Sequence, residues 1–166
     1  VEISHDPFLP LTLGAAATER VDLITGIAVA FARNPMNAAV IANDINRLSN
    51  GRFILGLGSQ IKPHIEKRFS MTWSQPAARM RELILAMRAI WACWNEDVPL
   101  QFEGEFYRHT LMTPFFNPGR NPHGNPRVFL AAVGEQWGGR EYCRGRLCLQ
   151  PFVAPFMASR GLAISR

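Results

Sequence analysis

The sequence predicts an α/β fold in which short buried strands alternate with helices. Strand-like and helix-like segments alternate from Val1 to Gly58, with connections of a few residues, as in a parallel sheet. The run from Phe53 to Leu57 is almost continuously apolar, which is typical of a strand covered on both faces. Gly58 follows at the strand end, where parallel α/β folds bind ligands. The glycine either admits a ligand close to the backbone or only permits tight packing.

The first elements are assigned from turn and capping signals. Val1–Ile3 reads as the end of a strand, and the following Asp-Pro pair marks a turn. A helix is predicted from Leu9 to Arg20, with an alanine-rich centre suited to close packing on a sheet. The β-branched segment Val21–Val29 is predicted to be one continuous strand.

Asn34 and Pro35 predict the start of a second helix, because Asn is a good N-cap and Pro suits the first helical position. The helical spacing of apolar residues predicts a buried stripe of Met36, Val40, Ile41, Ile45 and Leu48. The turn residues Ser-Asn-Gly at 49–51 then lead into a strand from Arg52 to Leu57.

Beyond Gly58 the chain is predicted to hold an irregular insertion (Ser59–Gln75), a long helix (about Ala77–Asn95), a β-hairpin with glycine in the turn (Leu100–Arg108), a loop (Pro114–Pro126) and a buried strand (Arg127–Ala132). The long helix has one apolar face, which we interpret as core. That face comprises Met80, Leu83, Ile84, Met87, Ile90, Trp91 and Trp94.

Composition is that of an ordinary globular protein, with 166 residues, 48% hydrophobic and 19% charged. Three scattered cysteines do not suggest a disulfide framework, and no apolar run has membrane length. A cytoplasmic protein without membrane partners is therefore expected. Because the chain begins at Val1 with what reads as a strand end, we expect an N-terminal truncation or an incomplete gene sequence.

The excess positive charge lies in the tail, residues 136–166, which hold five arginines and one glutamate. The main body, residues 1–135, is nearly neutral, so no nucleic-acid partner is expected for it. The tail is either a basic, partly disordered extension or the product of out-of-frame translation, which we favour. A nucleic-acid-binding protein, based on the tail alone, is the weakest interpretation.

Motifs for familiar chemistry are few. The histidines are well separated and no Cys-x-x-Cys pair occurs, so no metal site is expected. There is no P-loop, and Gly56-Leu57-Gly58 stops short of a dinucleotide-binding motif. By residue chemistry alone, the strand-end residues Glu2, His5, Gly26, Ile27, Gly58 and Ser59 could converge on one ligand face.

Several of these segments together resemble the bacterial luciferase-like family. They are Glu2 with His5-Asp6-Pro7-Phe8, Thr25–Val29, Asn34-Pro35 with Ala42, Leu48–Ser59, the hairpin Phe102–Tyr107 and the strand Val128–Gly134. The resemblance covers about residues 1–135 and is nearest to a branch dependent on coenzyme F-420, a deazaflavin also written F420. It implies part of an eight-stranded TIM (β/α)8 barrel, roughly its second to fifth strands, followed by an atypical tail from 136 to 166.

The resemblance also implies a chemistry. A luciferase-like oxidoreductase of this branch transfers hydride between the deazaflavin and an organic substrate, which the sequence does not identify. The alternative is an FMN-dependent luciferase-like monooxygenase, whose reduced ring reacts with oxygen. An alternative of another class is an inactive, non-catalytic remnant of a disrupted gene, in which unpaired strand edges would favour self-association into a homo-oligomer.

The resemblance assigns cofactor-binding roles to Glu2, His5, Gly26, Ile27, Gly58 and Ser59. It implies a non-prolyl cis peptide at Gly26–Ile27; the alternative is an ordinary trans strand with a glycine kink. Glu2 and His5 could instead serve an N-cap or a turn. In a branch that oxidises a sugar phosphate, a Glu stands where this chain has Ile61. No catalytic acid or base is therefore assigned.

Overall fold

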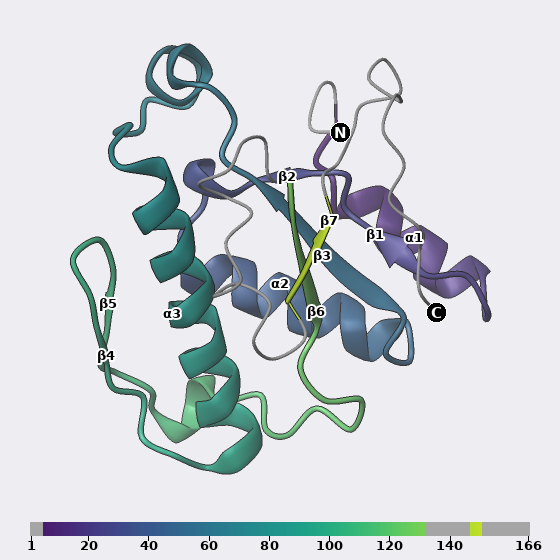
Figure 1. Ribbon diagram of the computed structural model, residues 1–166. Helices are drawn as coiled ribbons and strands as arrows, with labels where there is room; N and C mark the ends of the chain where they lie inside the picture. The colour runs from purple at the N-terminus through teal and green to yellow at the C-terminus, as the bar shows by residue number, and fades with distance from the viewer. Residues whose placement is uncertain (1–4, 132–146, 151–166) are drawn as a thin grey trace.

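The computed structural model describes residues 5–131 and 147–150 (Figure 1). Its helices are α1 (Leu9–Ala17), α2 (Pro35–Leu48) and α3 (Pro76–Glu96), with the short turns η1 (Ala30–Ala32), η2 (His64–Arg68) and η3 (Pro114–Phe116). Its strands are β1 (Leu23–Ile24), β2 (Ala28–Val29), β3 (Phe53–Gly58), β4 (Phe102–Glu103), β5 (Arg108–His109), β6 (Arg127–Ala131) and β7 (Leu147–Gln150). The predicted alternation of strands and helices is confirmed.

The main sheet is parallel, with β3 at its centre. Its order is β1-β3-β6-β7, and β2 also pairs with β3. All these pairings are parallel. The hairpin β4–β5 is a separate antiparallel pair, inserted between α3 and β6. The sequence therefore predicted both the parallel sheet and the hairpin.

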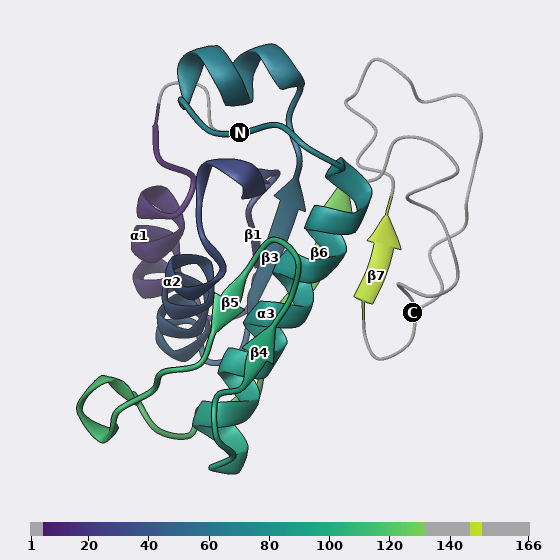
Figure 2. The ribbon, with the colours of Figure 1, turned by 90° about the vertical axis from the view of Figure 1, so that its left-hand side faces the viewer.

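Helices α1, α2 and α3 lie on one face of the main sheet, while β7 lies away from them (Figures 1 and 2). Side chains of the strands alternate accordingly: Val128 and Leu130 in β6 are buried in the core, while Phe129 between them is half-exposed. Helices on one face are characteristic of a β/α barrel, whereas doubly wound sheets carry helices on both faces.

Helix α3 confirms its predicted apolar face. All seven predicted residues are buried, and Trp91 also donates from its indole nitrogen to the carbonyl oxygen of Ala39 in α2, at 3.1 Å. This bond satisfies the polar atom of a fully buried aromatic side chain. The long helix therefore joins α2 and the sheet into one core.

Helix α2 begins as predicted, because the Asn34 side chain accepts the Asn37 backbone N–H at 2.9 Å. The predicted stripe, however, is confirmed only in part. Ile45 is buried and Met36 and Ile41 are half-buried, but Val40 is 41% exposed and Leu48 59% exposed. Alanines 38, 39 and 42 face the core instead, because small side chains let the helix approach its neighbours closely.

The prediction of one continuous strand over Val21–Val29 is wrong, since β1 and β2 are separated by three residues. Ile24 pairs with Ile54 and Ala28 with Leu57, so four steps along this segment match three along β3. The extra residue makes the interruption a bulge. The peptide bond Gly26–Ile27 within it is cis, as the resemblance implied.

Arg52, in the Ser-Asn-Gly-Arg-Phe segment, joins α1 to β3. Its guanidinium donates to the carbonyl oxygens of Ala15, Thr18 and Val21 at 3.2, 2.6 and 2.7 Å. It also donates to the Thr18 hydroxyl at 3.0 Å and, through Nε, to the Ser49 carbonyl at 2.8 Å. Arg52 therefore satisfies carbonyl groups at the C-terminal end of α1 that the helix itself leaves open.

The tail contributes β7, which pairs with β6 in parallel. The sequence did not predict this strand. The rest of the tail, with the expected strand end at Gly134-Glu135 and the expected change of character near residue 136, lies outside the described residues. No helix in the described ranges is long and apolar enough to cross a membrane.

Candidate functional site

The bulge between β1 and β2 is fixed to β3 by one side chain. The hydroxyl of Thr25 donates to the carbonyl oxygen of Gly56 at 2.7 Å and accepts the backbone N–H of the same residue at 2.8 Å. Thr25 is buried. Its hydroxyl therefore bonds to both backbone groups of Gly56 at the point where regular pairing is interrupted.

Gly56 and Gly58 leave room for the bulge. A β-carbon on Gly56 would lie 1.9 Å from the Thr25 carbonyl oxygen, and one on Gly58 would lie 2.6 Å from Cδ1 of Ile27. The first contact is with backbone, which cannot move aside cheaply. Of the two roles weighed for these glycines, the structure shows tight packing for both.

A small pocket of about 110 Å³ opens beside the bulge. Its lining is mostly apolar and comes from the bulged segment, from β3 and from the carboxyl half of β6. The lining residues are Ile24, Thr25, Ile27, Gly56, Phe129, Leu130 and Ala131. Ligands of parallel α/β folds bind at this end of the strands, so this pocket is the candidate site.

The structure brings four of the six predicted site residues together. Gly26 and Ile27 form the bulge, Gly58 packs against Ile27, and Ser59 follows directly in the chain. The Ser59 hydroxyl donates to the carbonyl oxygen of Gln60 at 3.1 Å. His5 is exposed, and Glu2 lies outside the described residues.

Of the residues that line this pocket, only Ile27 belongs to the predicted set. Sequence reasoning missed the other six: Ile24, Thr25, Gly56, Phe129, Leu130 and Ala131. Phe129 could have been found, because it lies in the carboxyl half of the strand next to β3, on the face away from the core. Thr25 carried no such signal. Its role depends on the bulge, and the segment had been assigned to a regular strand.

An ion pair joins the turn that precedes α1 to the residue that follows η1. Arg33 contacts Asp6 at 2.9 Å, and its guanidinium lies 5.1 Å from the centre of the Phe8 ring. Partial burial by itself raises the pKa of Asp6. The Phe8 backbone N–H and the Arg33 guanidinium outweigh that effect and hold the pKa below its usual value. Asp6 therefore remains charged in mildly acidic solution.

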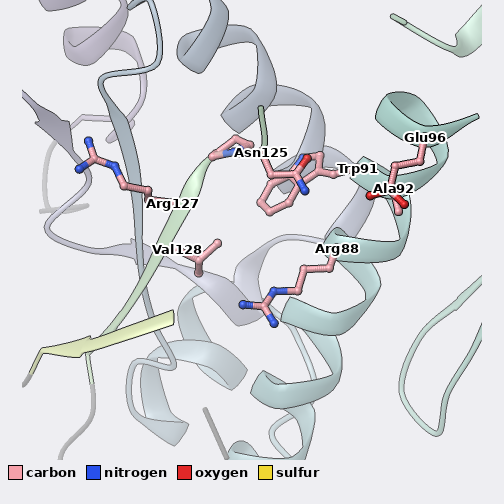
Figure 3. A pocket seen from close by; sticks show the side chains of 8 residues that line it. Arg88, Trp91, Ala92, Glu96, Asn125, Arg127 and Val128 are labelled. Atoms are coloured by element: carbon pink, nitrogen blue, oxygen red, sulfur yellow. The ribbon is translucent and has the colours of Figure 1, made fainter. Parts of the chain in front are cut away.

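A larger pocket of about 450 Å³ lies at the other end of β6 (Figure 3). Arg88, Trp91 and Glu96 line it from α3, and Asn125 and Val128 from the segment that enters β6. The Arg127 guanidinium extends to the side away from Arg88 (Figure 3) and pairs with Asp22 at 2.9 Å. This pocket is at the amino ends of the strands. The catalytic and ligand-binding residues of a parallel α/β fold are not expected there.

Among residues 5–131 and 147–150, no group of three His, Cys, Asp or Glu side chains could hold a metal ion. The candidate site is instead apolar and backbone-rich. Such a surface suits the face of a planar organic group, with specificity supplied by a few polar atoms.

The family model described as luciferase-like monooxygenase matches residues 1–140. The chain belongs to this family. Members of the luciferase-like family are oxidoreductases or monooxygenases, and the resemblance stated from the sequence is confirmed.

Luciferase-like relatives are longer than this chain. An uncharacterized protein of Mycobacterium tuberculosis is 61% identical over 134 residues, which are 81% of this chain and 39% of the relative. An F420-dependent glucose-6-phosphate dehydrogenase of Intrasporangium calvum is 32% identical over 130 residues, covering 69% of this chain and 35% of the relative. The chain thus spans less than half the length of these luciferase-like proteins.

A similar solved structure is the monooxygenase RslO1 from Streptomyces bottropensis. It superposes with a TM-score of 0.66 at 28% identity, covering 78% of this chain and 38% of RslO1. The luciferase-like fold is therefore supported by structure as well as by sequence.

Proposed function

We propose that this chain carries part of the cofactor site of a luciferase-like oxidoreductase, one that transfers hydride between coenzyme F420 and an organic substrate. The observation that carries the proposal is the apolar pocket around Ile27, at the carboxyl ends of β1 and β6 and beside Gly56 of β3. The F420-dependent relative supports the choice of a deazaflavin. An FMN-dependent monooxygenase is the second candidate, supported by the similarity to RslO1. Both belong to a partial TIM barrel in this proposal.

The residues present fit one wall of a flavin-type ring site. Ile24, Ile27 and Phe129 offer apolar side chains, and Gly56 offers none. The volume of about 110 Å³ is below the roughly 300 Å³ from which ligand pockets usually start. The remaining walls would come from outside the described residues, in keeping with a chain shorter than its relatives.

In this proposal each residue has a limited role. Ile24, Ile27 and Phe129 pack against the ring and exclude water, and Thr25 holds the bulge in place through Gly56. Gly26, Gly58 and Ser59, together with Glu2 and His5, border the ring as cofactor-binding residues. The bound deazaflavin supplies hydride at its own ring, so the protein positions it and no acid or base is assigned.

The test is a binding titration of the 166-residue chain with coenzyme F420 and, separately, with FMN, followed by fluorescence. The decisive variant is Ile24→Asp, which places a charge in the pocket at a residue already 40% exposed. Its matched control is Leu48→Asp, because Leu48 is 59% exposed on α2. We expect at least a tenfold weaker affinity for Ile24→Asp and no change for the control.

The other outcomes are equally informative. Tighter binding of FMN than of F420 would favour the monooxygenase. If the folded wild-type chain, checked by circular dichroism, bound neither cofactor, the proposal would be overturned for this chain. Equal loss of affinity in both variants would show that the pocket is not part of the cofactor site.

A further inference from the structure

Arg79, in the second turn of α3, contacts three separate segments of the chain. Its Nε donates to the Tyr107 hydroxyl at 3.0 Å, and its Nη1 donates to the carbonyl oxygen of Thr72. Its guanidinium also lies 5.0 Å from the centre of the Phe31 ring and 5.7 Å from that of Tyr107. One half-buried side chain therefore joins the connection after β3, the turn after β2 and the hairpin.

Two of these segments continue directly from the candidate site. Phe31 is in η1, which follows β2 and therefore follows Ile27 by four positions. Thr72 belongs to the connection that leaves β3 after Gly58. Phe31 also packs edge-on against Trp73, with ring centres 5.7 Å apart. Arg79 and Trp73 thus both contact the Phe31 ring.

The hairpin β4–β5 carries Tyr107, one of the residues that Arg79 contacts. Both oxygens of the Glu82 carboxylate accept backbone N–H groups at the hairpin tip, from Glu105 at 3.0 Å and from Phe106 and Tyr107 at 2.7 Å. Hydrogen bonds to a charged acceptor are stronger than neutral ones. Figure 2 shows the hairpin running beside α3. Tyr107 is therefore held in place where it receives Arg79.

We propose that Arg79 is a positioning residue of the cofactor site. It holds together the connection after β3 and the turn after β2, the two segments that follow Gly58 and Ile27 in the chain, without touching the cofactor itself. The claim about the cofactor rests on the proposed function, but the claim about the two connections can be measured on the chain alone.

Arginine suits this role and lysine does not. The planar guanidinium can stack on Phe31 and Tyr107 while its edge donates to Thr72 and the Tyr107 hydroxyl. A lysine ammonium keeps the charge but loses the planar stack and the fixed fork of donors. Arg79→Lys is therefore expected to behave like Arg79→Met.

The test is amide hydrogen exchange on the full chain, compared between wild type, Arg79→Met and the control Arg81→Met, because Arg81 is an exposed residue of the same helix. The reporting amides are those of Ile65, Phe69 and Met71, which are bonded within the connection after β3. We expect at least tenfold faster exchange there and at the hairpin tip in Arg79→Met, with β3 and α2 unchanged. The control should match wild type.

Cofactor titration of the same variants separates this inference from the proposed function. With coenzyme F420 bound by wild type, Arg79→Met should weaken binding about tenfold or more, while Arg81→Met should not. Normal exchange at Ile65, Phe69 and Met71 in Arg79→Met, or a uniform increase across the chain, would overturn the positioning role. Failure of wild type to bind cofactor would overturn the proposed function alone, and the exchange result would still decide the role of Arg79.

Discussion

Thr25 forms both of its hydroxyl hydrogen bonds with Gly56, accepting the N–H and donating to the C=O of that one residue. A side chain thus takes the place of a paired strand at the point where β1 ends. The hydroxyl bridges both backbone groups of Gly56 between the pairing of Ile24 with Ile54 and the pairing of Ala28 with Leu57.

Thr25→Val should destabilise the fold by about 1–3 kcal/mol, because the isosteric side chain removes the buried hydrogen bonds of the hydroxyl to Gly56. The measurement is urea unfolding. The control is Thr12→Val: the Thr12 hydroxyl only bonds back to the Phe8 carbonyl within α1, so about 0.5 kcal/mol or less is expected. A cost for Thr25→Val no larger than that of the control would contradict the role of the hydroxyl.

Gly56→Ala should be among the most damaging single substitutions in the described ranges, costing about 3 kcal/mol or more. Its β-carbon would meet the Thr25 carbonyl oxygen at 1.9 Å, and overpacking of this kind typically costs about 1–3 kcal/mol even where neighbours can move. Gly14→Ala is the control. Its β-carbon would lie 3.3 Å from a flexible Leu23 side-chain atom, and alanine favours the helix by about 1 kcal/mol. The midpoints of thermal unfolding should shift by clearly different amounts in the two variants. Similar midpoints would argue against close packing at the bulge.

Arg52→Met should lower the free energy of unfolding by about 2–3 kcal/mol, because it leaves carbonyl groups at the end of α1 without donors. The nearby exposed Arg20 is the control, and Arg20→Met should change stability by about 0.5 kcal/mol or less. Helical amides of α1 should also exchange faster in Arg52→Met. Unchanged exchange in α1 would show that the helix end does not need this arginine.

Stability should decrease as the pH falls below about 6.5, the ordinary pKa of histidine, in part because of His109. Burial lowers the pKa of His109, and its Nε2 is buried with no hydrogen-bond partner in the described structure. The unfolded chain therefore binds a proton at a higher pH than the folded chain, so stability is lost between the unfolded pKa and the lower folded pKa.

Guanidinium unfolding at pH 7.5 and 5.0 measures this effect. His109→Leu should reduce the difference between the two pH values, while the exposed His5 serves as control in His5→Leu. A difference that stays the same in His109→Leu would assign the pH dependence to other groups.

The sequence predicted the elements whose patterns come from large side chains. The face of α3 is correct because leucine, methionine and tryptophan at helical spacing leave one way to bury the helix. The stripe of α2 is wrong for Val40 and Leu48, because small alanines, which contribute little to a hydrophobic pattern, occupy the closest contacts with the core. Hydrophobicity ranks residues by size, whereas close packing of a helix selects for small ones.

The structure brings together some of the residues proposed for the site. Gly26, Ile27, Gly58 and Ser59 come together because strand ends of a parallel sheet meet at one edge. The contacts of Thr25, Arg52 and Arg79 could not be predicted from the sequence, since each depends on a group that the tertiary fold brings close from a segment about 30 or more residues away. The sequence shows that a polar residue can form hydrogen bonds, but the tertiary fold determines which group it bonds to.

The bulge between β1 and β2 also changes the phase of the strand. In an uninterrupted strand, even and odd positions face opposite sides, so Ile24 and Ile27 would point apart. Both line the pocket, while Leu23 and Ala28 both belong to the core. One additional residue is enough to produce this. A regular strand with the same number of residues would turn Ile27 toward the helices, so the bulge, as much as the composition of the segment, determines which side chains the pocket receives.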